Sequence, residues 1–286
     1  MSSRTNRFTG RRILITGPDG FIGKHLVRYL RKRNFLVIPW RRDVRKLIRF
    51  EKPVDIVIHL AGAARRSQFR RNARSATDVN VLGTRNALDL CRARSAMMIL
   101  PSTAGVYGNR SGAASEHHKP APITPYARSK QRAEQLCRMY SQKYGVRTVV
   151  LRIFNVYGPE QNREFLLPHL AHCVKHGRAA TLKNPEARRD FIHISDVVSA
   201  IHAAIQAPTG RMAIYNIGSG KDVSVGEVVK KLSRMARRPV QWKQNALTGR
   251  EIHSSRADIR KARRELRWVP RVSLTAGLRS MLSATS

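Results

Sequence analysis

The sequence predicts an α/β fold in which a doubly wound parallel sheet is joined to a smaller, interleaved C-terminal lobe. Four residues of strand character after Arg11 run into three glycines spaced three residues apart, and an apolar face at helical spacing follows. Short apolar segments then alternate with helical ones, as in parallel βαβ units. Beyond Asn155 the pattern becomes mixed. We therefore expect two parts, residues 1–155 and 156–286, with strands of the second part returning to the main sheet.

Composition predicts a globular protein. The 286 residues are 42% hydrophobic, and no run approaches the roughly 20 apolar residues of a membrane span. The basic segment Met1–Arg11 lacks the apolar stretch of a signal peptide. Cys91, Cys137 and Cys173 are few, odd in number and outside metal-ligand spacing, which predicts a reducing compartment and no metal site. We expect a cytoplasmic protein without a membrane span.

Charge is the unusual feature of the chain. The 55 Lys and Arg residues stand against 18 Asp and Glu residues, and a net charge of +37 attracts anions. Arginine is spread over the whole chain, with its densest run at residues 65–74, and the sequence contains no nucleic-acid recognition module. The charge therefore predicts small anionic ligands and no specific nucleic-acid partner.

The glycine-rich segment predicts a dinucleotide site in the first part of the chain. Gly17 can take the tight turn that leaves the strand, Gly20 lets a phosphate approach the backbone, and Gly23 lets the helix pack close to the strand. The helix N-terminus offers free N–H groups and a partial positive charge to a pyrophosphate. A tight turn without a ligand is the alternative for this segment alone. The residues assigned to the site here are Gly17, Asp19, Gly20, Phe21, Ile22 and Gly23.

The second predicted strand, Phe35–Ile38, indicates where the adenosine ribose lies. Asn34 before it suits a left-handed end to the preceding helix. The end of this strand meets the ribose about 20 residues beyond the glycines, and an acidic residue there favours NAD. Arg41 and Arg42 stand there instead, where a 2′-phosphate would lie. The expected cofactor is NAD or NADP, and the two arginines favour NADP.

The elements that follow alternate between helix and strand. The segment Val54–Gly62 is predicted as a buried strand that ends in small residues, which make room for a ligand lying across the sheet. Thr124 and Pro125 suit the N-cap and the first position of a helix that runs to about Tyr144. The other predicted elements up to this helix are a short helix after Asp43-Val44, a helix at Asn80–Leu88, a strand at Met97–Leu100 and a loop at residues 108–125.

The second part mixes short strands and helices. Ser195-Asp196 suits the cap of a helix at Val197–Gln206, and Ser224 with Glu227 forms a capping box. The other predicted elements are strands at Thr148–Ile153, Arg188–Ile194 and Ala213–Gly218 and a helix at Phe165–His176.

Tyr126 and Lys130 lie one turn apart on a predicted helix. A phenol has an unperturbed pKa near ~10, and a neighbouring ammonium favours the phenolate. Such a tyrosine can exchange a proton with a sugar or alcohol hydroxyl while a nicotinamide exchanges hydride with the carbon. An exposed Tyr–Lys pair without a catalytic role is the alternative for this pattern alone.

Taken together, these motifs resemble the extended short-chain dehydrogenase/reductases of the NAD(P)-dependent nucleotide-sugar epimerase/dehydratase family. The resemblance implies a Rossmann domain at residues 1–155 that carries NAD or NADP. It also implies a lobe at residues 156–286 that binds a nucleotide-diphosphate sugar. The matching motifs, in order, are Thr16-Gly17 to Gly23, His59–Gly62, Asn80 to Thr84, Ser102 to Gly108, Tyr126 to Lys130, Arg152 to Pro159, Arg189 to Asp196, and Ala257 to Pro270.

The resemblance also implies roles for single residues. Tyr126 would be the acid/base, Lys130 would position the ribose and tune Tyr126, and Thr103 would hydrogen-bond the reacting oxygen. Substrate would be bound by Asn155 and Arg189, the latter at the diphosphate. The second diphosphate arginine falls at Thr248, so Arg250 is assigned in its place. The remaining implied cofactor residues are Asp43, Val44, Leu60, Ala61, Gly62 and Asn80, besides Tyr126 and Lys130.

The reaction expected from the resemblance is redox at one sugar carbon. Ala104 and Gly105 follow Thr103, where relatives that eliminate water or act on a uronic acid place acidic residues, so 4,6-dehydratase is disfavoured. We favour a nucleotide-sugar epimerase that removes hydride transiently, with C4 as the expected carbon. The alternatives are an NADPH-dependent nucleotide-4-keto-sugar reductase and a non-catalytic dinucleotide-binding scaffold. Helices near residues 80–94 and 126–144 pair relatives into homodimers, and here their arginines would oppose pairing unless anions intervene.

Overall fold

The computed structural model describes residues 10–182, 184–207, 210–238, 242–244 and 252–284. The chain forms two compact units, each assembled from three segments. Unit 1 consists of Met1–Ser102, Arg128–Leu151 and Val198–Ile214. Unit 2 consists of Thr103–Ala127, Arg152–Val197 and Tyr215–Ser286. The assignment of functional domains to residues 1–155 and 156–286 stays a prediction.

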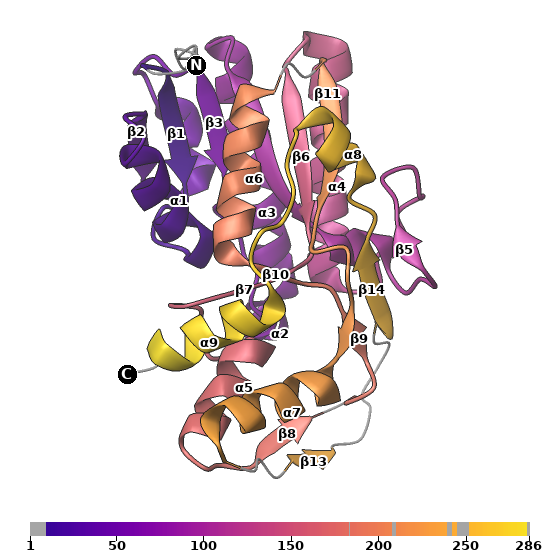
Figure 1. Cartoon of the computed structure of the whole chain (residues 1–286). Helices are drawn as coiled ribbons and strands as arrows, with labels where there is room; N and C mark the ends of the chain where they lie inside the picture. The colour runs from indigo at the N-terminus through magenta and orange to yellow at the C-terminus, as the bar shows by residue number, and fades with distance from the viewer. Residues whose placement is uncertain (1–9, 183, 208–209, 239–241, 245–251, 285–286) are drawn as a thin grey trace. The chain divides into compact units, whose positions relative to one another are not determined.

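A six-stranded sheet forms the centre of unit 1 (Figure 1). Its strand order is β11-β6-β4-β3-β1-β2, and β1 pairs in parallel with both β2 and β3. The chain leaves β1 for β2 on one side and returns to β3 on the other, so the strand order reverses at β1. The predicted doubly wound parallel sheet is confirmed. The strands are β1 (Arg12–Thr16), β2 (Leu36–Trp40), β3 (Ile56–His59), β4 (Met97–Thr103), β6 (Thr148–Ile153) and β11 (Met212–Ile217).

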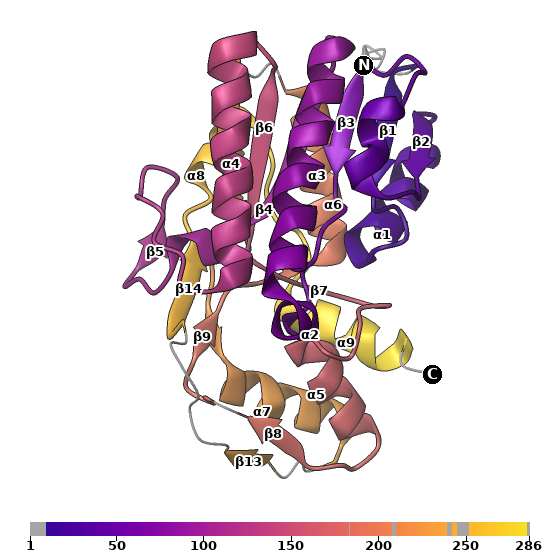
Figure 2. The same ribbon diagram turned by 180° about the vertical axis from the view of Figure 1, so that it is seen from behind.

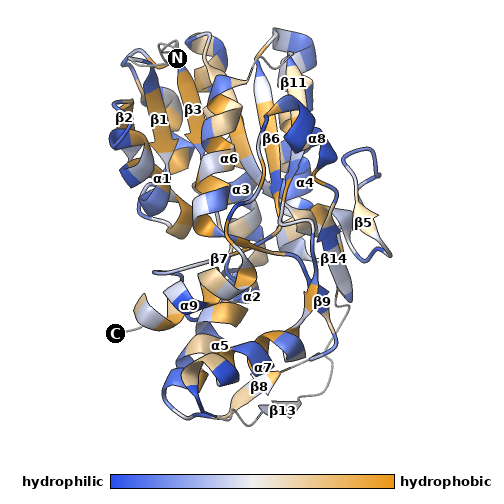
Figure 3. Cartoon of the chain, in the orientation of Figure 1, coloured by the Kyte–Doolittle hydropathy of each residue, from blue (hydrophilic) through white to orange (hydrophobic). Residues whose placement is uncertain are grey.

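Helices cover both faces of this sheet. Helices α1 (Phe21–Arg31) and α6 (Ile194–Gln206) lie on the face seen in Figure 1. Helices α3 (Ala73–Ala93) and α4 (Pro125–Tyr144) lie on the opposite face, seen in Figure 2. Figure 3 shows β1 and β3 as strongly hydrophobic, which is expected of parallel strands buried on both faces. The short helices η1 (Val44–Arg49) and α2 (Arg66–Arg71) complete the unit.

Most predicted elements of this unit are present, with shifted ends. Asn34 has a φ of 59°, which confirms the left-handed position before β2. The helix predicted at Asn80–Leu88 is the middle of the longer α3. Asn72 caps α3, because its Oδ1 accepts the backbone N–H of Ser75 at 2.9 Å. The first two turns of α3 consist mostly of small and polar residues, which hid this start from the hydrophobic pattern.

Unit 2 contains three small sheets. The four-stranded one has the order β12-β9-β14-β5, with β14 parallel to both β9 and β5. The other two are the parallel pairs β10–β7 and β13–β8. The strands are β5 (Ala113–Ala114), β7 (Asn155–Tyr157), β8 (Ala180–Leu182), β9 (Arg188–Arg189), β10 (Phe191–His193), β12 (Val223–Ser224), β13 (Trp242–Gln244) and β14 (Ser254–Ala257).

Three helices pack around a second apolar core in unit 2, α5 (Leu166–Lys175), α7 (Val225–Ala236) and α9 (Leu274–Ala284). The capping box predicted for α7 is confirmed: Glu227 N–H donates to Ser224 Oγ at 3.1 Å, and Ser224 N–H donates to Glu227 Oε2 at 2.8 Å. The remaining elements are the short helices η2 (Ala104–Tyr107) and α8 (Arg260–Glu265).

The predicted cap of α6 is wrong. The helix begins at Ile194, so Asp196 lies in its first turn and not before it. The Asp196 carboxylate instead accepts the backbone N–H groups of Arg271 and Val272, each at 3.0 Å. Sequence pattern missed this because the donors lie about 75 residues away in the chain.

Candidate active site

The glycine turn of unit 1 forms a backbone cradle at the end of β1. Gly17 has a φ of +65°, and a Cβ there would lie 2.8 Å from the Ala61 nitrogen in the loop after β3. A Cβ on Gly23 would lie 2.2 Å from the Gly17 carbonyl oxygen. Gly20 is the N-cap of α1 and supplies no side-chain hydrogen bond to the helix N-terminus. The helix N–H groups therefore fit a pyrophosphate, as a dinucleotide requires.

Two arginines follow β2 where the adenosine ribose is expected. Arg41 Nε lies 3.1 Å from Asp19 Oδ2, and both side chains are well exposed. Arg42 is exposed and has no acidic partner among the residues that the structure describes. An exposed ion pair contributes about 0–1 kcal/mol, so Asp19 holds Arg41 only weakly against an incoming phosphate.

Asp43 and Val44, predicted to contact adenine, both make contacts with other residues of the chain. Asp43 caps η1 by accepting the Arg45 backbone N–H at 2.9 Å, and the Arg45 guanidinium holds the pKa of Asp43 below its usual value. Val44 is buried, and a Cβ on Gly83 of α3 would approach its Cγ2 to 2.7 Å. Both residues thus fix η1 against α3, and their contact with adenine stays a prediction.

The loop after β3 is held by buried hydrogen bonds. The Asn80 amide nitrogen donates to the Ala63 carbonyl at 3.0 Å and to Ser129 Oγ at 2.8 Å, and its Oδ1 accepts the Ala63 N–H at 2.7 Å. Thr16 Oγ1 accepts the Ala61 N–H at 3.1 Å. These bonds fix the path of Leu60, Ala61 and Gly62, which are partly or fully exposed.

Lys130 lies on α4 in unit 1 and is buried. Burial lowers the pKa of Lys130 to about 8, against the opposing effect of Glu134 one turn further along. Glu134 is also buried and accepts the Ser102 hydroxyl at 2.5 Å. At neutral pH Lys130 therefore carries a positive charge for most of the time.

Unit 2 contains a cavity of about 210 Å³. Of the five residues predicted to contact the sugar or its diphosphate, four line this cavity. Thr103, Tyr126, Asn155 and Arg189 all line it. Arg250 lies outside the described residues, as does Thr248. The described lining contains no Asp or Glu, and its other members are Ala104, Gly105, Tyr107, Gly108, Arg110, Gly112, Ala114, Thr124, Ile153, Phe154, Ile252, Ser254, Ser255 and Arg256.

Thr103 and Tyr126 supply the two hydroxyl groups expected to act on the reacting oxygen. Thr103 Oγ1 accepts the Gly105 N–H at 3.1 Å, which orients the side chain and leaves its O–H to donate. Tyr126 is the second residue of α4, whose predicted N-cap is confirmed by a 3.1 Å bond from the Ala127 N–H to Thr124 Oγ1. Burial raises the pKa of Tyr126 to about 12, whereas the sequence predicted that Lys130 favours the phenolate. The phenol therefore keeps its proton at neutral pH.

A buried aspartate organises the wall that carries Asn155 and Arg189. The Asp190 carboxylate accepts the backbone N–H groups of Ser219, Gly220 and Ala257 at 2.7–3.0 Å. Its carbonyl accepts both the backbone N–H and the side-chain amide of Asn155, each at 3.0 Å. One residue thus ties β7 and β14 together next to Arg189.

Sequence reasoning gave no role to several polar residues of the cavity, Tyr107, Arg110 and Arg256 among them. Tyr107 was recognised only as part of a motif; its hydroxyl donates to Asn216 Oδ1 at 2.7 Å and its ring lies under the Arg152 guanidinium. Arg110 lies in a Gly- and Ser-rich loop that carries no pattern, and Arg256 precedes the Ala257-Asp258 motif. The pairing of β14 with β5 and β9, which brings these residues to one cavity, has no sequence signal.

The described residues contain neither a candidate metal site nor a candidate membrane-spanning helix. No group of three or more His, Cys, Asp or Glu side chains there is arranged to hold a metal ion. Among the described helices, none combines the length and apolar character needed to cross a membrane.

Comparison with known proteins places this geometry in a family. Residues 13–218 match the model of the NAD-dependent epimerase/dehydratase family. The GDP-6-deoxy-D-mannose reductase of Pseudomonas aeruginosa is 31% identical over 95% of this chain and 96% of its own. The structure of RMD from Pseudomonas aeruginosa complexed with NADPH has a TM-score of 0.87 at 29% identity, covering 96% and 98% of the two chains.

An epimerase is similar to the same degree. The structure of the Thermus thermophilus UDP-glucose 4-epimerase in complex with NAD has a TM-score of 0.87 at 28% identity and covers 96% of this chain and 98% of its own. The family match extends from β1 through the glycine turn and Tyr126 to the end of β11. The protein is an NAD(P)-dependent enzyme with an extended short-chain dehydrogenase/reductase fold, and it belongs to the NAD-dependent epimerase/dehydratase family.

Proposed function

We propose that the protein is a nucleotide-sugar epimerase that inverts one sugar carbon, C4, by transient removal of hydride. The observation that carries the proposal is the cavity in which Thr103, Tyr126 and Arg189 meet without any carboxylate in the described lining. Dehydration would need an acid/base pair beside the sugar, and the residues after Thr103 are Ala104 and Gly105. Redox at a carbon that bears a hydroxyl needs only one proton carrier.

The proposed roles follow from the contacts of each side chain. Arg189 binds the diphosphate through its guanidinium, which is anchored by a 2.9 Å bond to the Arg188 carbonyl. Thr103 donates its hydroxyl to the reacting oxygen, and Tyr126 accepts and later returns the proton of that oxygen. A bound NAD(P) would supply the hydride acceptor and donor for this carbon. Lys130 and the glycine turn bind the cofactor.

A second candidate function is reduction of a nucleotide-4-keto-sugar with NADPH. The pKa of Tyr126, raised to about 12, favours it, because a phenol that keeps its proton is suited to protonate a developing alkoxide. Arg41 and Arg42 also suit NADPH, and a GDP-sugar reductase is among the similar proteins. Epimerisation needs Tyr126 to release its proton first, which requires a cationic neighbour in the complex.

We also propose a cellular location and a mode of assembly for the protein. Cys91, Cys137 and Cys173 are all free thiols, which supports a reducing compartment such as the cytoplasm. A homodimer through α3 and α4 would bring together Arg85, Arg92 and Arg138, so we expect pairing to strengthen with added anions.

The experiment is a substrate panel followed by product stereochemistry. UDP-, GDP- and dTDP-sugars, including 4-keto forms, are incubated with NAD, NADH, NADP or NADPH, while proton NMR reports the product and absorbance reports reduced cofactor. We expect inversion at C4 with no net cofactor consumption. Stoichiometric NADPH oxidation by a 4-keto sugar identifies the reductase instead. No turnover of any sugar in the panel, with cofactor bound, contradicts both proposed functions.

A further inference from the structure

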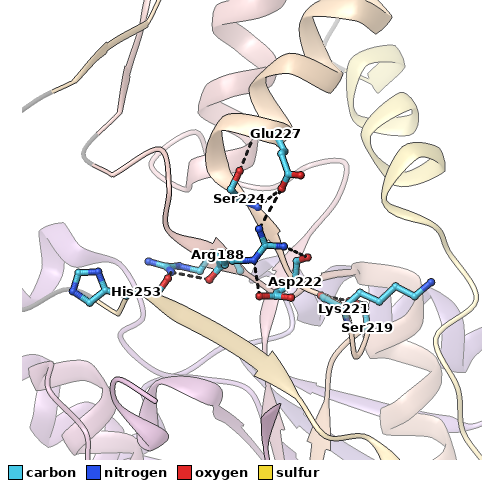
Figure 4. Close-up of polar contacts among 8 residues, drawn as sticks. Arg188, Ser219, Lys221, Asp222, Ser224, Glu227 and His253 are labelled. Carbon is cyan, nitrogen blue, oxygen red and sulfur yellow. Dashed lines mark hydrogen bonds and ion pairs between the residues drawn. The ribbon is translucent and has the colours of Figure 1, made fainter. Parts of the chain in front are cut away.

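Glu134 is a buried acidic residue that the proposed function does not use. Three of the acidic residues that the structure describes are buried, namely Glu134, Asp190 and Asp196. The last two accept backbone N–H groups from distant segments. Less buried carboxylates pair with arginines, as Asp222 does with Arg188 at 2.9 Å (Figure 4). Because an acidic side chain is rarely buried without a compensating charge, the position of Glu134 needs a physical reason.

A hydrogen bond from the sheet of unit 1 fixes the Glu134 carboxylate. Ser102, which is also buried, donates its hydroxyl to Glu134 Oε1 at 2.5 Å. Ser102 belongs to β4 and Glu134 to α4, so the bond joins the sheet to the helix. A hydrogen bond to a carboxylate is short and strong, but a neutral hydroxyl does not cancel the negative charge. The compensating charge has to come from another group.

Lys130 supplies that charge. It precedes Glu134 by four residues on α4, so the two side chains lie one turn apart on the same face of the helix. Lys130 is 9% exposed, and its side chain has no hydrogen bond or ion pair with any residue that the structure describes. The charge of Glu134 nevertheless raises the pKa of Lys130, because charges interact strongly in the low dielectric of a protein interior.

The other described titratable groups that face Lys130 are uncharged at neutral pH. His59 on β3 is buried, and burial lowers its pKa to about 3. Burial raises the pKa of Cys137, further along α4, to about 12. Tyr126, one turn before Lys130 on the same helix, also has its pKa raised to about 12 by burial. Among these groups, Glu134 is therefore the charge that opposes the loss of the Lys130 proton on burial.

We propose that Glu134 is a positioning residue that acts through Lys130, because its buried charge keeps the Lys130 ammonium protonated in the free enzyme. The proposal rests on the proposed function, in which Lys130 binds the cofactor. Burial lowers the pKa of Lys130 to about 8 even with Glu134 present, so the margin above neutral pH is small. Without the carboxylate this pKa falls further, and Lys130 loses its proton as the pH rises through a lower value. The site then lacks a cationic donor near neutral pH.

The titration of Lys130 itself tests the proposal. The full-length protein is labelled with carbon-13 in its lysine side chains, and NMR follows each Cε signal between about pH 5.5 and 9.5. Lys130→Arg identifies the signal of Lys130 by its absence. Glu134→Gln keeps the shape of the side chain and removes its charge. We expect Lys130 to titrate near pH 8 in the wild type and about one pH unit or more lower in Glu134→Gln.

Two control variants separate the charge of Glu134 from its packing and from the net charge of the protein. Ser102→Ala removes the hydrogen bond and keeps the charge, and Glu51→Gln removes an exposed acidic residue of the same unit. In both, Lys130 should titrate within about 0.3 pH unit of the wild-type value. Thermal melting checks that each variant is folded, and Glu134→Met replaces Glu134→Gln if the latter does not fold.

Fluorescence titrations with NADPH and NADH show whether the charge of Lys130 affects cofactor binding. The affinity of Glu134→Gln for the preferred cofactor should be close to wild type at about pH 6.5 and about fivefold weaker at about pH 8. A Lys130 midpoint that stays within about 0.3 pH unit of wild type in Glu134→Gln overturns the proposal, since Glu134 then has a structural role alone. A midpoint that moves while the affinity loss is the same at every pH supports the coupling and contradicts the cofactor role of Lys130 in the proposed function.

Discussion

Asn80 and Asp43 of unit 1 are used in the opposite way to polar groups of the unit 2 cavity. Both are bonded to the protein itself: Asn80 makes three hydrogen bonds that hold the loop after β3, and Asp43 is paired with Arg45. In the unit 2 cavity, Thr103 has its O–H left to donate, and the half-buried Arg110 has no side-chain partner among the described residues. The loop after β3 is thus fixed by the protein itself, whereas the cavity of unit 2 has polar groups available for a ligand.

Because of this difference, we expect mutations of the two kinds of group to change different quantities: stability in one case, and affinity or rate in the other. A buried amide that supports a loop costs stability when it is removed, because its partners lose their hydrogen bonds without gaining water. Removing a partly exposed cavity group costs affinity or rate and changes folding little, because water can replace its hydrogen bonds to the protein. The predictions below test that division, beginning with the largest effect.

Tyr126→Phe should lower turnover by about 100- to 10,000-fold while folding and cofactor affinity stay at wild-type values. The ring keeps its packing, and only the hydroxyl that carries the proton is lost. Thr103→Ala is the companion variant and should cost less, since it removes one orienting hydrogen bond. Steady-state rates on the accepted sugar measure both. Turnover of Tyr126→Phe within a few-fold of wild type would show that another group carries the proton.

NADPH should bind about ten- to a hundred-fold more tightly than NADH, because two guanidinium groups near a 2′-phosphate contribute about 1.5–3 kcal/mol. Arg42→Gln should remove more of this preference than Arg41→Gln, since Asp19 already pairs with Arg41. Fluorescence titration with both reduced cofactors gives the ratio. Equal or tighter binding of NADH in the wild type would indicate that both arginines face solvent and would strengthen the epimerase function.

Asn80→Ala should lower the free energy of unfolding by about 1–3 kcal/mol, since the Ala63 backbone groups and Ser129 lose buried partners. Arg189→Gln, its counterpart in unit 2, should change stability by less than about 0.5 kcal/mol and weaken UDP binding about tenfold. Urea unfolding and calorimetry on both variants measure the two quantities. If the two variants exchange these effects, the division between the units is wrong.

The same division explains how much the sequence could predict. The glycine turn, Asn34 and the Ser224–Glu227 box are local patterns, and each has the predicted conformation. The cavity depends on short strands brought together from distant segments, such as Arg256 beside Ala113, and no local pattern encodes that pairing. Asp190 and Asp196 show the same limit, because their carboxylates bind backbone groups far away in the chain. The family resemblance gave roles to Thr103 and Arg189, which line the cavity, but none to Arg110, which lines it too.

Hydride removal and return at one carbon is the central claim, and an isotope label follows it most directly. The sugar nucleotide accepted in the panel is prepared with deuterium at C4 and converted by the wild type in ordinary water, and NMR and mass spectrometry locate the label in the product. The account predicts a C4 epimer that retains its deuterium at C4, with none in water and no net reduced cofactor. Deuterium released to water, or an epimer inverted at another carbon with C4 untouched, would contradict it.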